Sequence, residues 1–114
     1  MNYDFSFDQA RLNQLADQYL EHSSVTGRIL FLGSSTENRL DLATWQLNTE
    51  EDYEAFTCSG FKLQVMELLD TLMTYRAQHK QPNASQGVIH INGSRLSIEW
   101  LPKYEVEAMR NNVS

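Results

Sequence analysis

The spacing of apolar residues near the start of the chain predicts an amphipathic helix. Apolar side chains recur there at intervals of three and four positions: Leu12, Leu15, Ala16, Tyr19 and Leu20. Ser6 followed by Gln9 has the spacing of a capping box, which places the start of the helix. We expect this helix to continue to about His22.

A broader apolar stripe predicts the most buried helix of the fold, from Phe61 to about His79. Its members are Phe61, Val65, Met66, Leu68, Leu69, Leu72, Met73 and Arg76. A shorter, acidic helix is predicted before it, because Thr49 is a good N-cap residue and acidic residues follow in the first turn. This helix should end near Ser59 and Gly60.

The segment between these helices predicts a β-hairpin with a long loop. The short run from Arg28 to Leu32, which is partly β-branched or aromatic, is typical of a strand that is covered on both faces. A second strand is expected over residues 39–47, with Leu40 and Leu42 on one face. The other face would carry Ala43, Trp45 and Leu47.

A second hairpin is predicted around Asn92-Gly93, a dipeptide that favours a type I′ turn. That turn would pair Ile91 with Ser94 and His90 with Arg95. One face of this hairpin is then apolar and consists of Ile89, Ile91, Leu96, Ile98 and Trp100. The other face consists of Val88, His90, Arg95, Ser97 and Glu99. Pro102 should end the last strand, and residues 103–110 predict a short final helix.

The predicted order is therefore α-β-β-α-β-β with a C-terminal appendage. Hairpins imply antiparallel pairing, so we expect an α+β fold with an antiparallel sheet of about four strands and helices packed on one face. A chain of 114 residues is near the usual size of one domain, and we expect residues 1–114 to form a single domain.

The charge balance disfavours whole classes of ligand. The chain has 9 Lys and Arg against 15 Asp and Glu, a formal net charge of −6, and the basic residues are scattered. We therefore expect no binding to nucleic acid and no docking on anionic membranes. No apolar run is long enough to span a bilayer, and the N-terminus lacks the apolar region of a secretory signal. Cys58 is the single cysteine, which fits a reducing, cytoplasmic location.

The densest acidic and aromatic stretch is the first candidate for a site. Aromatic anchors among acidic residues suit an interface with a basic protein. The candidate residues for this partner-binding surface are Glu37, Asp41, Trp45, Glu50, Glu51, Asp52, Tyr53 and Glu54. The acids lack the spacing of a calcium loop, so we expect no metal and no cofactor here.

Two smaller candidates carry polar chemistry. His90, Arg95 and Glu99 share the polar face of the last hairpin, where together they could hold an anion or a carboxylate. Cys58 precedes a predicted helix N-terminus, a position that favours a reactive thiolate. No base is assigned to it by the sequence, and no known nucleophile, phosphate-loop or zinc motif is present.

These observations favour a small, non-enzymatic protein-binding module, of the inhibitor, immunity-protein or adaptor type, that occludes the surface of a basic partner. Self-association is the alternative, because the apolar strand from Ile29 to Leu32, with Trp45 and Leu47, could continue a sheet or core across a dimer axis. A small enzyme or ligand binder that uses Cys58 or His90 ranks third.

Overall fold

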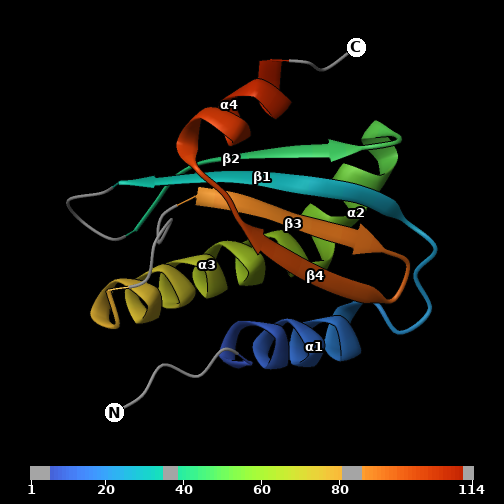
Figure 1. Cartoon of the computed structure of the whole chain (residues 1–114). Coiled ribbons are helices and arrows are strands. Elements are labelled where there is room, and N and C mark those ends of the chain that lie inside the picture. Colours follow the sequence, from blue (N-terminus) through green and yellow to red (C-terminus); the bar gives the residue numbers. More distant parts are fainter. Residues whose placement is uncertain (1–5, 35–38, 81–85, 112–114) are drawn as a thin grey trace.

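A four-stranded antiparallel sheet with the strand order β2-β1-β3-β4 forms the centre of the molecule (Figure 1). The computed structural model describes residues 6–34, 39–80 and 86–111. The elements in chain order are α1 (Phe7–Tyr19), β1 (Thr26–Ser34), β2 (Arg39–Leu47), α2 (Glu50–Ser59), α3 (Phe61–Gln78), β3 (Gln86–Asn92), β4 (Arg95–Trp100) and α4 (Lys103–Asn111). The predicted α+β class and element order are confirmed.

The two hairpins are joined into one sheet by pairing between β1 and β3. Ile29 lies opposite Trp45 of β2 on one side and opposite Ile89 of β3 on the other. On β1, Ile29 and Phe31 face one core while Leu30 faces a second, and none of the three is more than 1% exposed. The prediction that this strand is covered on both faces is therefore confirmed.

Helices cover both faces of the sheet, but unequally. The helices α1, α2 and α3 pack on one face, as predicted, and enclose the main core, which contains Leu12, Phe61 and Leu69. The opposite face carries α4, whose Val106 packs on Leu30 and Val88 (Figure 1). The sequence predicted α4 but did not place it. None of the helices in the described ranges is long and apolar enough to cross a membrane.

The predicted cap is correct for α2 and wrong for α1. Thr49 accepts a hydrogen bond from the backbone N–H of Asp52 (3.1 Å), and Gly60 ends α2 with a φ of 89°. Ser6 makes no such side-chain bond, and α1 ends at Tyr19 rather than near His22. The side chain of Gln9 turns instead to the sheet and donates to the carbonyl of Leu96 (2.8 Å). Tertiary contact with β4 has replaced the local capping box.

The predicted faces of β2 are partly wrong, because the strand contains an irregularity. Leu32 pairs with Leu42 and Gly33 pairs with Leu40, so Asp41 is an extra residue in the ladder. A bulge of this kind changes the alternation of side chains. Leu40 therefore packs on the main core, while Leu42, which was expected on the same face, shares the outer face with Leu32 and is 38% exposed.

The register of the β3–β4 hairpin differs from the prediction by two residues. Asn92 pairs with Arg95 and His90 with Ser97, so Gly93 and Ser94 form the turn. Gly93 has a φ of 63°, whereas Asn92 and Ser94 are not at positive φ, a pattern typical of a type II′ rather than a type I′ turn. A shift of two residues leaves each side chain on its predicted face. The apolar and polar faces are therefore as predicted, while the cross-strand partners are wrong.

Candidate functional site

The acidic residues of α2 form a negatively charged surface on this helix. Glu50, Glu51 and Glu54 are exposed, and Asp52 is partly buried beside the cap. The described part of the chain holds no group of three potential metal ligands, so these carboxylates do not converge on a common point. The ion pairs between described side chains are His90–Glu99 and Lys103–Glu107, and neither involves α2. The helix thus presents uncompensated negative charge, which we call the α2 acidic surface.

The aromatic residues expected in this surface are engaged within the protein. Trp45 is half-buried and packs on Tyr53, Phe56 and Phe61, with ring centroids about 6 Å apart. Tyr53 accepts a hydrogen bond from Lys62, whose ammonium also lies 4.7 Å from the centre of the Tyr53 ring. Trp45 of β2 therefore packs against Tyr53 and Phe56 of α2. The nearby cation, Lys62, faces the Tyr53 ring rather than the carboxylates.

Two predicted members of the acidic patch have side chains that the structure does not describe. Glu37 lies outside the described residues. The backbone of Asp41 is described as part of β2, but its side chain is not. The acidic surface is therefore defined here by Glu50, Glu51, Asp52 and Glu54.

The polar face of the last hairpin brings together only part of the predicted group. His90 Nε2 lies 2.8 Å from Glu99 Oε1, and both side chains are open to solvent. Arg95 does not lie opposite His90, because the two-residue shift places Ser97 there and moves Arg95 to the end of the hairpin, opposite Asn92. The predicted His–Arg–Glu group is thus a His–Glu pair, with Arg95 at a separate position.

Two residues near this pair, Arg28 and Gln46, were not predicted from the sequence. Arg28 of β1 lies opposite both His90 of β3 and Gln46 of β2, and its Nε donates to Gln46 Oε1. The side-chain nitrogen of Gln46 is buried and has no hydrogen-bond partner among the described residues. Alternation of Arg28 with Ile29 in β1 signals that the two side chains lie on different faces. The neighbours of Arg28 depend on pairing between distant strands, for which the sequence has no signal.

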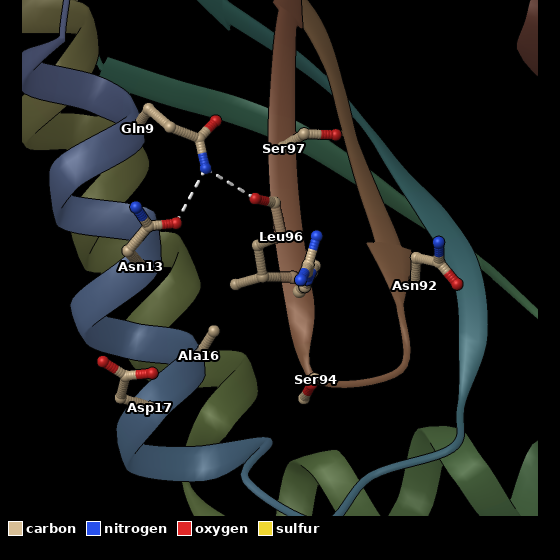
Figure 2. Close-up of a pocket in the computed structure, with 9 residues that line it drawn as sticks. Gln9, Asn13, Ala16, Asp17, Asn92, Ser94, Leu96 and Ser97 are labelled. Atoms are coloured by element: carbon tan, nitrogen blue, oxygen red, sulfur yellow. Dashed lines mark hydrogen bonds between the residues drawn. The ribbon is translucent and has the colours of Figure 1, made fainter.

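A groove with a volume of about 660 Å³ lies between α1 and the edge strand β4. In Figure 2 the side chains of Gln9 and Ala16 on α1 point toward β4. Asn13 and Asp17 of the same helix also line the groove. The opposite wall is formed by residues of the last hairpin, among them Ser94, Arg95 and Ser97. Gln9 spans the groove, since its side-chain nitrogen donates both to Asn13 Oδ1 (2.9 Å) and to the carbonyl of Leu96. No sequence motif marks this groove.

Cys58 and the remaining histidines do not assemble with these groups. Cys58 is exposed in the last turn of α2. His79 caps the end of α3, where its Nδ1 lies 2.9 Å from the carbonyl oxygen of Tyr75. His22 is exposed beyond the end of α1 and does not cap it.

Comparison with known proteins gives no further indication of function. No protein-family model matches the chain, and neither a curated protein nor a solved structure is found to be similar. The function is therefore inferred from the surfaces described above.

Proposed function

We propose that this chain is a small, non-enzymatic protein-binding module that occludes a basic surface of a partner protein with its α2 acidic surface. The observation that carries the proposal is the set of exposed carboxylates on α2 that make no ion pair with another described residue. A solvated surface of one charge steers an oppositely charged protein into contact and is available for direct ion pairs.

The support beneath α2 makes this surface suitable for recognition. Phe56 is buried in the main core, and Thr49 fixes the start of the helix. The carboxylates are thus held on a fixed element, so that less conformational entropy is lost when a partner binds. Their spread over the helix suits a broad protein surface better than a single ion.

The test is affinity capture from extract of the native host, with the wild-type chain and two matched variants. Glu51→Gln/Glu54→Gln removes charge from α2, and Glu21→Gln/Glu67→Gln removes the same charge from exposed positions elsewhere. We expect a partner that is retained by the wild type and by the control pair but lost from the α2 variant. Retention should fall as salt rises from about 0.1 M to about 1 M, because screening then acts over about 3 Å instead of about 10 Å.

Loss of the partner with both variants would show a dependence on net charge alone and would contradict a specific α2 surface. Retention by all three proteins would also contradict it.

A second candidate function is self-association through the edge of β2, which forms one side of the sheet. From Leu42 to Leu47 this edge strand has neither a charged residue nor a proline, the devices that commonly prevent edge-to-edge pairing.

We expect a concentration-dependent dimer in sedimentation equilibrium that Thr44→Lys abolishes, since Thr44 lies on the outer face of this edge, opposite Leu30. Ser97→Lys, on the outer face of the other edge strand, should leave the dimer intact. A monomeric wild type, or equal loss in both variants, would rule out pairing through β2.

A further inference from the structure

The groove between α1 and β4 has a hydrogen-bonding wall made of backbone. β4 is the second edge of the sheet, so one side of its backbone has no neighbouring strand in the part of the chain that the structure describes. The carbonyl of Leu96 points to this side, because it accepts from the side chain of Gln9 on α1. In an antiparallel strand the N–H and the carbonyl of one residue point the same way. The N–H of Leu96 therefore also faces the groove.

The bond from Gln9 to Leu96 indicates which kind of group this wall accepts. A glutamine carboxamide has the same donor and acceptor groups as a peptide unit. Its N–H reaches the Leu96 carbonyl at 2.8 Å, as the N–H of an added strand would. At the far end of β4, Trp100 Nε1 donates to Asp8 Oδ2 (2.8 Å), which ties that end to α1. The groove accordingly lies along the hairpin end of β4, beside Leu96.

The α1 and β4 sides of the groove carry opposite charges, and between them lies a small apolar surface. Asp17 lies on the α1 side and Arg95 on the β4 side, and both are exposed. Ala16 and Leu96 are 3% and 2% exposed and form the apolar part of the lining. Among the described residues of the lining, Arg95 alone is cationic, so the groove is poorly suited to a polyphosphate or a nucleic acid. Amide and hydroxyl groups, together with one acidic and one basic residue on opposite walls, instead match a peptide backbone with charged side chains.

We propose that this groove binds an extended peptide segment of another protein, which adds to the edge of β4 with an acidic side chain near Arg95 and a basic side chain near Asp17. Addition of a strand to an open sheet edge beside a helix is a general mode of peptide recognition, in which backbone bonds give affinity and flanking side chains give specificity. This site is separate from the α2 acidic surface and does not depend on it.

The probe is a phage-displayed library of linear seven-residue peptides, selected on the immobilised full chain. A selected peptide is then synthesised with a fluorophore, and its affinity is measured by fluorescence polarisation. Asn13→Trp should fill the groove and weaken binding about tenfold or more, a loss of about 1.4 kcal/mol. The matched control is Gln14→Trp, on the next residue of α1, which lines a different hollow between α1 and α3. It should bind the peptide as the wild type does.

A second variant keeps the test valid if Asn13→Trp fails to fold. Asp17→Lys/Arg95→Glu exchanges two exposed charges, leaves the net charge unchanged, and should reject the selected peptide. On binding to the wild type, the backbone amide of Leu96 should show one of the largest shifts in ¹⁵N–¹H NMR spectra.

Three outcomes would overturn the proposal. These are a library that yields no binder, equal effects of Asn13→Trp and Gln14→Trp in folded proteins, and peptides whose binding is abolished by Glu51→Gln/Glu54→Gln. The last result would assign the peptides to the α2 acidic surface, so failure of this proposal is distinguishable from failure of the first.

Discussion

Gly87 occupies a position on β3 where two neighbouring strands leave no room for a side chain. It lies opposite Phe31 of β1 and Trp100 of β4. The rings of these two residues pack edge to face, with their centroids 5.4 Å apart. A Cβ atom at Gly87 would lie 2.2 Å from the carbonyl oxygen of Glu99 and 3.0 Å from Phe31 Cζ. The first of these atoms belongs to a paired backbone and cannot move away without disturbing the ladder.

We therefore expect Gly87→Ala to lower the free energy of unfolding by about 1–3 kcal/mol, the usual cost of overpacking a core. Urea unfolding followed by tryptophan fluorescence measures this change. Ser97→Ala, an exposed change on the neighbouring strand, should alter the stability by no more than about 0.5 kcal/mol. A Gly87→Ala protein as stable as the wild type would show that β3 and β4 are further apart at this point.

At the scale of elements, the sequence predicts best what is decided locally. The bounds of α2 follow from Thr49 and Gly60, which act on their own helix, and both are observed at its ends. The stripe that starts at Phe61 likewise predicts α3, because its period of three to four residues is a property of one segment. Side-chain faces in the last hairpin are also predicted correctly, because a period of two survives a shift of two residues.

What the sequence could not predict depends on contacts between elements. The hairpin turns at Gly93-Ser94 rather than at Asn92-Gly93, and the N–H of Gly93 donates to the carbonyl of Val25 (2.9 Å), a residue just before β1. Gln9 similarly bonds to Leu96 instead of closing its own helix. The same limit applies to the candidate sites. The α2 acids are adjacent in sequence and were predicted, whereas the groove joins α1 to a strand near the other end of the chain.

At the scale of the whole molecule, the sheet separates two cores of unequal size. Both tryptophans, Trp45 and Trp100, are partly buried and pack against the main core. The smaller core lies on the other face, where Val106 of α4 covers Leu30 and Val88, and all three are at most 1% exposed. Leu30 and Ile29 are adjacent in β1 but belong to different cores. The shared strands should therefore make the two cores unfold together.

This coupling predicts that a change in α4 is detected by tryptophans on the opposite face. Val106→Ala should lower the free energy of unfolding by about 2 kcal/mol, because it removes buried methyl groups and leaves a cavity against Leu30 and Val88. Tyr104→Ala, on the same helix but at a side chain that is 71% exposed, should change it by no more than about 0.5 kcal/mol. The measurement is the urea midpoint of tryptophan fluorescence, compared with that of far-ultraviolet circular dichroism.

If Val106→Ala leaves the fluorescence transition unchanged while circular dichroism shows an earlier loss of helix, α4 opens on its own and the two cores are not one cooperative unit. Coincident shifts of both transitions would show that α4 stabilises the sheet as a whole, and with it the edges at which the proposed partners bind.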